Sequence, residues 1–218
     1  MNTRSTRLLA SALITLTAAL SGCTSAPAAQ TPPIVQPGAP GQSSRVVSPD
    51  AAARLQRPAL SAADVKFMQG MIGHHAQAIE MTGLLATRTR SADMRKLAQR
   101  IEASQADEIR MMQEWLTSRG AELPSQHAHH GSGAVLMPGM LTPDEMGRLA
   151  AASGPAFDQL FLEYMIRHHE GALVMVKELF AAPGAAQDSE IYAFASDVNA
   201  DQRMEIGRMA AMFKELQT

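Results

Sequence analysis

The sequence predicts an all-α protein, a four-helix bundle built from two copies of one helical hairpin. The main observation is an internal repeat, since residues 67–81 read FMQGMIGHHAQAIEM and residues 161–175 read FLEYMIRHHEGALVM. The segment that follows each copy recurs as well, because residues 101–112 resemble residues 198–209. In both segments apolar residues recur with the 3.6-residue period of a helix. A hairpin that occurs twice predicts two similar halves packed together.

Capping residues and helix breakers set the expected helix boundaries. Ser61 with Asp64 has the pattern of a capping box, Ser91 is a good N-cap, and Asp188 or Ser189 caps the last helix. Thr142 opens a short helix that Gly-Pro ends. The sequence therefore predicts one domain, residues 59–218, with a central loop at 120–141 and helices at residues 61–88, 92–118, 142–152, 156–181 and 189 to almost the C-terminus.

Residues 1–22 have the features of a secretory signal peptide. Arg4 and Arg7 precede an apolar run that is too short for a transmembrane helix. The run ends in Leu-Ser-Gly followed by Cys23, the only cysteine, which resembles a bacterial lipobox. We expect Cys23 to be lipidated and to hold the protein on a bacterial membrane, facing the periplasm or the cell exterior. An ordinary cleaved signal with an incidental cysteine is the alternative.

The segment between Cys23 and the domain, residues 23–58, is rich in Pro, Ala, Gly, Gln and Ser. Such a composition buries too little apolar surface to offset its ordering entropy, so it predicts a disordered tether. Without residues 1–22 the chain keeps 17 of its 19 basic residues and all 21 acidic ones, which gives a formal charge of −4. An acidic domain without a basic run does not favour nucleic acid as a partner.

The repeated helices place histidine and methionine on one apolar stripe. In the first copy Met71 lies one turn before His74 and His75, and the second copy repeats this order. Imidazole and thioether groups form a soft ligand set, which suits copper, Cu(I) above all, better than magnesium or calcium. Zinc or another transition metal stays open because imidazoles suit those ions too. The candidate metal ligands are Met71, His74, His75, Met112, Met165, His168, His169 and Met209.

A structural interpretation competes with this one. Buried histidines are often core residues satisfied by hydrogen bonds, and methionine commonly fills irregular gaps. Duplication favours a metal site, because burying an adjacent histidine pair twice without partners is costly. Polar residues on the second and fourth helices are the candidate partners of these imidazoles, namely Gln105, Glu108, Gln202 and Glu205.

The central loop contains a histidine-rich tract, HAHHGSGAVLMPGM, with His127, His129 and His130. Such tracts can bind metal, but exposed ones also occur without a role. A loop of this length is uncommon unless it is functional or disordered.

The sequence resembles the ferritin-like family catalogued as domain of unknown function 305 over about residues 60–216. The resemblance rests on the doubled Phe-x-x-x-Met-Ile-x-His-His-x-x-Ala pattern, on Met-Pro-Gly-Met and on Phe157-Asp158-x-x-Phe161. It implies an exported helical bundle and copper handling, carried by the Met-Ile-x-His-His motifs. Two departures suggest unequal halves: Leu162 stands where the first copy has Met68, and Gly171 where it has Gln77.

We therefore predict copper binding, sequestration or transfer in the cell envelope, with no catalytic turnover. A di-iron oxidase needs Glu-x-x-His motifs, and the acids on the repeated helices do not have that spacing. A copper oxidase stays open, since it needs only an open coordination position. A metal-free helical interaction module, with the Met and His stripe as core, is the remaining alternative. The sequence leaves a homodimer open as well.

Overall fold

The structure is a computed structural model that describes residues 33–36, 43–53, 60–124 and 136–217. The chain divides into two compact units, Met1–Leu55 and Gln56–Thr218. Cys23 and the predicted signal peptide lie outside the described residues. None of the described helices combines the length and the apolar character needed to cross a membrane.

The described part of the first unit holds a small antiparallel ribbon and one short helix. Strand β1 (Ile34–Gln36) pairs with β2 (Arg45–Val47), and helix α1 (Pro49–Ala53) follows. The sequence predicts no strands in this segment. The β-branched residues of the two strands explain the ribbon, since such residues favour extended backbone and cross-strand pairing. The tether role of residues 23–58 stays a prediction.

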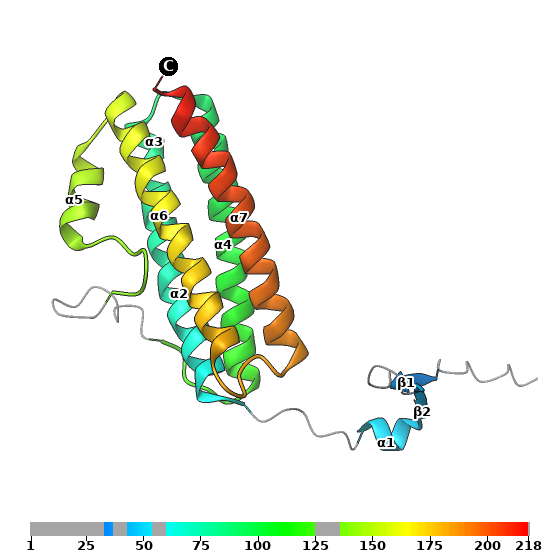
Figure 1. The fold of residues 1–218 in the computed structure, drawn as a ribbon. Coiled ribbons are helices and arrows are strands. Elements are labelled where there is room, and N and C mark those ends of the chain that lie inside the picture. The colour runs from blue at the N-terminus through cyan, green and yellow to red at the C-terminus, as the bar shows by residue number, and fades with distance from the viewer. Residues whose placement is uncertain (1–32, 37–42, 54–59, 125–135, 218) are drawn as a thin grey trace, which may run out of the picture. The chain divides into compact units, whose positions relative to one another are not determined.

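The described part of the second unit is helical, which confirms the predicted all-α bundle. Its four long helices lie side by side in Figure 1, with α2 packed against α4, α6 against α7, and α2 against α6. The two repeated segments thus form two helical hairpins that meet along α2 and α6. The helices are α2 (Ala62–Gly83), α3 (Leu85–Arg88), α4 (Ala92–Ser118), α5 (Pro143–Ala151), α6 (Gly154–Ala181) and α7 (Ser189–Glu215).

The predicted caps open the helices as expected. Ser61 and Asp64 form a reciprocal capping box at α2, and Thr142 with Glu145 forms another at α5. Asp188 caps α7 by accepting a hydrogen bond from a backbone N–H in its first turn. These local interactions fix where the helices begin without help from the core.

Two predicted boundaries differ from the structure. The first long helix ends at Gly83, not at residue 88, and α3 is a separate turn. Glycine weakens the helix there, and the N–H of Leu84 bonds to the carbonyls of Met81 and Thr82, which closes the last turn. Helix α6 begins at Gly154, two residues early, because a proline fits in the first turn of a helix.

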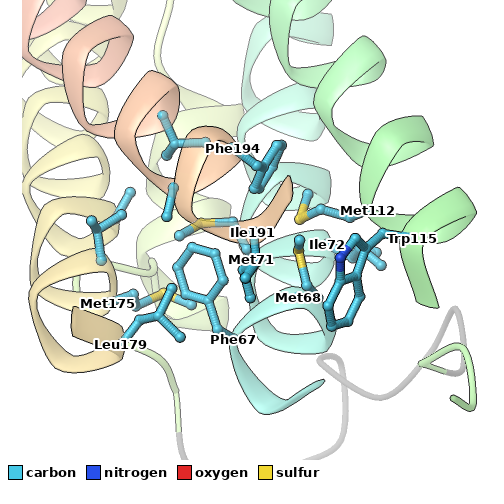
Figure 2. Close-up of a cluster of buried hydrophobic side chains, with 14 of the residues drawn as sticks. Phe67, Met68, Met71, Ile72, Met112, Trp115, Met175, Leu179, Ile191 and Phe194 are labelled. Atoms are coloured by element: carbon cyan, nitrogen blue, oxygen red, sulfur yellow. The ribbon is translucent and has the colours of Figure 1, made fainter. Parts of the chain in front are cut away.

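The bundle core consists of two separate apolar clusters. Figure 2 shows the Trp115 cluster, which includes Met68, Met112 and Trp115. The Phe157 cluster fills the other end of the bundle. The Trp115 cluster includes Phe67, Met68, Met71, Met112, Trp115, Met175, Leu179, Phe194 and Val198. The Phe157 cluster includes Ala78, Met81, Leu97, Ile101, Phe157, Phe161, Met165 and Met209.

Residues 136–142, which we name the connector, lead from the central loop into α5 and lie against both hairpins. The amide of Gln77 holds the backbone of Leu141 by two hydrogen bonds, one of 2.9 Å to its carbonyl and one of 2.7 Å from its N–H. Opposite, a Cβ on Gly171 would lie 1.9 Å from Pro138 O, so only glycine lets the connector approach α6. These contacts explain why the two copies of the repeat differ at this position.

A pair of contacts ties the hairpins together at one end of the bundle. The Asp64 carboxylate accepts a 2.8 Å hydrogen bond from the backbone N–H of Ala186, in the turn between α6 and α7. The Arg119 guanidinium, at the end of α4, lies 2.7 Å from the Asp188 carboxylate. Both contacts join residues of different hairpins, so they help to fix the alignment of the two halves.

We predict that Gly171→Ala destabilises the protein by about 1–3 kcal/mol, because the new methyl group meets connector backbone that cannot move aside without losing its hydrogen bonds. The free energy of unfolding is measured by urea denaturation. Gly207→Ala on α7 is the matched control, since nothing lies within 4 Å of its Cβ position. It should be stabilising by about 0.5–1 kcal/mol through helix propensity. Equal effects of the two substitutions would contradict this account of the connector.

Candidate metal centre

Polar side chains occupy the middle of each long helix, between the stretches that build the two apolar clusters. On α2, Met71 belongs to the Trp115 cluster, Ala78 to the Phe157 cluster, and the two histidines lie between them. The same order recurs on α4, α6 and α7. We name this level of the bundle the polar layer, and its members are His74, His75, Gln105, Glu108, His168, His169, Gln202 and Glu205.

The four histidines form the centre of the polar layer, and each is 0% exposed. The rings of His74 and His168 lie against each other across the α2–α6 contact, with centroids 3.8 Å apart and planes tilted by 38°. His75 is 6.4 Å from His74, and His169 is 6.2 Å from His168, measured between ring centroids. The structure therefore brings the two predicted histidine pairs into one buried group.

Each outer histidine has a carboxylate partner on the other helix of its own hairpin. His75 Nε2 donates a short hydrogen bond to Glu108 Oε2, and His169 Nε2 donates to Glu205 Oε2 at 2.6 Å. The pairing of Glu108 and Glu205 with imidazoles is therefore as the sequence predicts. A carboxylate that accepts from one ring nitrogen fixes the ring orientation and makes the other nitrogen a better ligand.

These hydrogen bonds decide which nitrogen of each ring carries a lone pair. A neutral imidazole that donates through Nε2 keeps its lone pair on Nδ1. The Nδ1 atoms of His75 and His169 are buried and make no hydrogen bond within the described part of the chain. His74 donates through Nε2 to the carbonyl of Pro138 at 3.0 Å, so its lone pair also lies on Nδ1. The layer thus presents lone pairs inside a dry core.

His168 is held in its neutral form. Burial lowers the pKa of the His168 imidazole well below its usual value of 6.5, and the neighbouring rings of His74, His169 and His75 lower it further. The nearby backbone of His74 partly offsets this lowering, but neither ring nitrogen makes a hydrogen bond of normal geometry within the described residues. A neutral imidazole without a partner is ready to act as a metal ligand, because a metal competes only with protons for its lone pair.

The two glutamines of the layer do not pair with the histidines. Gln105 is 1% exposed, and neither of its amide atoms has a hydrogen-bond partner in the described residues. Gln202 is 2% exposed, and its carbonyl oxygen is likewise without one. The predicted role of these residues as direct partners of the imidazoles is therefore not seen. Buried amides without partners are costly.

The four candidate methionines flank the polar layer in two pairs. Met71 and Met112 belong to the Trp115 cluster, and Met165 and Met209 belong to the Phe157 cluster. All four are 0% exposed. The eight predicted ligands are therefore not one compact group: the imidazoles lie in the middle and a thioether pair lies on either side. Whether these residues bind a metal stays a prediction.

An acidic seam between α4 and α7 borders the polar layer. The carboxylates of Glu108 and Glu205 are slightly exposed there, with side-chain exposures of 11% and 18%. Burial raises the pKa of Asp201 on α7, and repulsion from Glu108, Glu205 and Asp197 raises it further. The negative charge of this seam attracts cations toward the layer.

The described residues contain no ready-made metal site of three or more histidine, cysteine, aspartate or glutamate side chains. A site in this layer would therefore need thioether or amide ligands besides the imidazoles. His127, His129 and His130 of the central loop lie outside the described residues, so their role stays a prediction.

Sequence reasoning missed the connector. The carbonyl of Pro138 accepts a hydrogen bond from His74. Gln77 holds the connector by hydrogen bonds to Leu141, and Gly171 leaves room for Pro138 beside α6. The available signals were the Met-Pro-Gly-Met motif and the Gln-to-Gly difference between the two copies. Both indicate that the two hairpins differ, but neither shows that a backbone carbonyl reaches the polar layer.

A family model for DUF305, a domain of unknown function, matches residues 64–213. The chain belongs to the DUF305 family. The matched DUF305 region contains all four long helices except for a few terminal residues. No curated protein matches the chain.

Solved structures agree with this assignment. A DUF305 protein of Streptomyces coelicolor is 29% identical with a TM-score of 0.63, and the match covers 72% of this chain and 94% of that one. A DUF305 fragment from Deinococcus radiodurans is 28% identical with a TM-score of 0.63, covering 72% and 99%. CopM in its Cu(II)-bound form is 27% identical with a TM-score of 0.58, covering 70% and 96%. CopM has also been solved with Cu(I) and with silver.

We predict that the metal-free protein loses stability as the pH falls below about 6.5. His168 resists protonation in the folded state but not in the unfolded state, so the unfolded chain binds the extra proton. Each such proton lowers the free energy of unfolding by about 1.4 kcal/mol per pH unit. Urea denaturation between pH 7 and pH 5 measures the slope. The His168→Leu variant should show a shallower slope, and an unchanged slope would contradict the assignment.

Proposed function

We propose that this DUF305 protein binds copper in the bundle and stores or transfers it in the cell envelope. The observation that carries the proposal is the polar layer, in which four fully buried imidazoles lie between two pairs of buried thioethers. The proposed ligands are drawn from Met71, His74, His75, Met112, Met165, His168, His169 and Met209.

The chemistry of the donor set favours a soft cation. Thioether and imidazole ligands select Cu(I) over hard cations such as magnesium and calcium. The dry, apolar clusters on both sides of the layer also favour an ion of low charge, because desolvating a divalent ion costs more. Zinc or another transition metal remains the alternative cargo, since imidazoles alone suit those ions.

Similarity to CopM supports copper as the cargo. CopM has been solved in Cu(I)-bound and Cu(II)-bound forms and is 25% and 27% identical to this chain in the two comparisons. A silver-bound CopM structure is also 25% identical. Silver(I) is a soft monovalent cation like Cu(I), so this neighbour agrees with the soft character of the layer.

The glutamates and glutamines of the layer serve the ligands in this proposal. Glu108 and Glu205 orient His75 and His169 and direct their Nδ1 lone pairs inward. Gln105 and Gln202 are buried one turn before Glu108 and Glu205 on the same helices. We propose that their amide groups gain hydrogen-bond partners when the layer rearranges around a metal. We propose binding and exchange without catalytic turnover, because weak thioether ligands release a metal easily.

The proposed location is the outer side of a bacterial membrane. Residues 1–22 would direct export, and a lipid on Cys23 would anchor the tether that carries the bundle. The related Streptomyces coelicolor protein is inferred to be secreted, which agrees with an exported chain.

Anaerobic titration with Cu(I) against a competing chelator, with Zn(II) as a parallel ligand, tests the proposed function. We predict that the quadruple variant in which His74, His75, His168 and His169 become Leu loses high-affinity Cu(I) binding and keeps its helical circular dichroism. The wild-type protein should gain thermal stability on binding Cu(I), while the variant should not. Unchanged affinity in this variant would move the site away from the bundle core.

Two further variants make this test specific. Replacing His127, His129 and His130 together leaves the bundle intact and should leave the high-affinity site unchanged. Replacing Met71, Met112, Met165 and Met209 with Leu conserves volume, with a cost below about 1.5 kcal/mol per site. This second variant should weaken Cu(I) binding more than Zn(II) binding, because only Cu(I) prefers thioethers. If neither metal binds the wild-type protein, the metal-free interaction module becomes the better interpretation.

We predict that Cys23→Ala releases the exported protein from the membrane fraction into the soluble fraction. The measurement is cell fractionation followed by detection of the intact chain. A Ser25→Ala variant is the control, because it changes a neighbouring residue without removing the thiol that would carry the lipid. Membrane association that survives the loss of Cys23 would contradict a lipid anchor at this residue.

A further inference from the structure

A cavity of about 500 Å³ opens on the face of the bundle where α2, α6 and the connector meet. Phe67 and Gly70 line it from α2, Met175 lines it from α6, and Met137 and Pro138 line it from the connector. Figure 2 shows the inner wall, where Phe67, Met175 and Leu179 lie together. Neither Met137 nor Met175 belongs to the ligand set of the polar layer.

Two methionine side chains approach Gly70 in this cavity. A Cβ on Gly70 would lie 3.1 Å from the sulfur of Met137 and 3.3 Å from Cε of Met175, the methyl carbon bonded to its sulfur. The absence of a side chain at Gly70 therefore creates the space that both thioethers border. The corresponding position in the second copy is a tyrosine, Tyr164. The thioether pair is thus specific to one face of the bundle.

The cavity is adjacent to the polar layer. Pro138 lines the cavity, and its carbonyl accepts the 3.0 Å hydrogen bond from His74. Pro138 therefore borders the cavity and also contacts the His74 ring. The connector, which the two-fold repeat does not include, forms this link.

The chemistry of the cavity suits a soft ion of low charge. Lys66 and Glu178 both line it, so their opposite charges offset each other. The remaining donors are two thioether sulfurs, which bind soft metals, beside the aromatic ring of Phe67, which favours a cation on its face. Hard divalent cations would find a single carboxylate opposed by an ammonium group.

We propose that this cavity is an outer binding site for a soft monovalent cation, Cu(I) or Ag(I), held by the thioethers of Met137 and Met175. The proposal rests on the proposed function, since it supplies a first station from which the same cargo reaches the polar layer. It adds ligands that neither copy of the Met-Ile-x-His-His repeat provides.

Titration of the whole protein with Ag(I), followed by the methyl NMR signals of ¹³C-methyl methionine, tests the proposal. The chain has 15 methionines, and single Met→Leu variants assign their signals. We expect the signals of Met137 and Met175 to shift together, as a separate binding event from those of Met71 and Met112. If the core signals shift while Met137 and Met175 stay still, the outer site is wrong and the proposed function survives. If no methionine signal shifts, both are wrong.

Variants provide an independent measurement with Cu(I) itself. The double variant Met137→Leu, Met175→Leu should bind one Cu(I) fewer per chain while the affinity of the remaining site is unchanged. Met111→Leu, Met204→Leu is the matched control, since these methionines are 50% and 67% exposed and should not alter the stoichiometry. Gly70→Ala inserts a methyl group between the thioethers and should raise the outer dissociation constant by about tenfold or more. Unchanged stoichiometry in the double variant, with an unchanged melting temperature, would overturn the outer site.

Discussion

The contact between the His74 and His168 rings is the constraint on which the rest of the bundle depends. Two imidazoles with centroids 3.8 Å apart in a fully buried position would repel each other strongly if both were charged. The apolar clusters on either side exclude water, and the carboxylates that stabilise the outer histidines lie at the edge of the layer, where solvent reaches them. The fold therefore holds the two inner rings between apolar clusters and pairs each outer histidine with a glutamate.

Duplication explains how such a layer is built, and the connector explains why it is not symmetric. Two hairpins of similar sequence supply equivalent histidine–glutamate pairs, and the inner histidines His74 and His168 meet between α2 and α6. The connector then lies on one face only, where it bonds to His74 and to Gln77. Of the two rings in contact, only His74 bonds to the connector. A ligand in the layer would meet two chemically different halves.

The sequence predicts the bundle, its caps and the four central histidines, because each depends on spacing along a single helix or on the repeat. It also predicts that Glu108 and Glu205 face the imidazoles, since both occupy the same place in each hairpin. The division of the methionines between two clusters depends on how the hairpins align, which contacts between the hairpins, such as Asp64 with Ala186, help to fix. The course of the connector depends on the space at Gly171, which becomes visible only in three dimensions.

The position of the connector between the hairpins determines which fragments of the chain can reconstitute the bundle. The two hairpins resemble independent modules, yet the carbonyl that satisfies His74 belongs to neither of them. A second-hairpin fragment that starts at α6 would lack this acceptor, whereas one that starts at residue 136 would carry it along with the backbone that Gln77 holds. Complementation between separately produced halves thus requires the longer fragment. The second hairpin is thus preceded by the connector, whereas the first hairpin has no equivalent segment within the described residues.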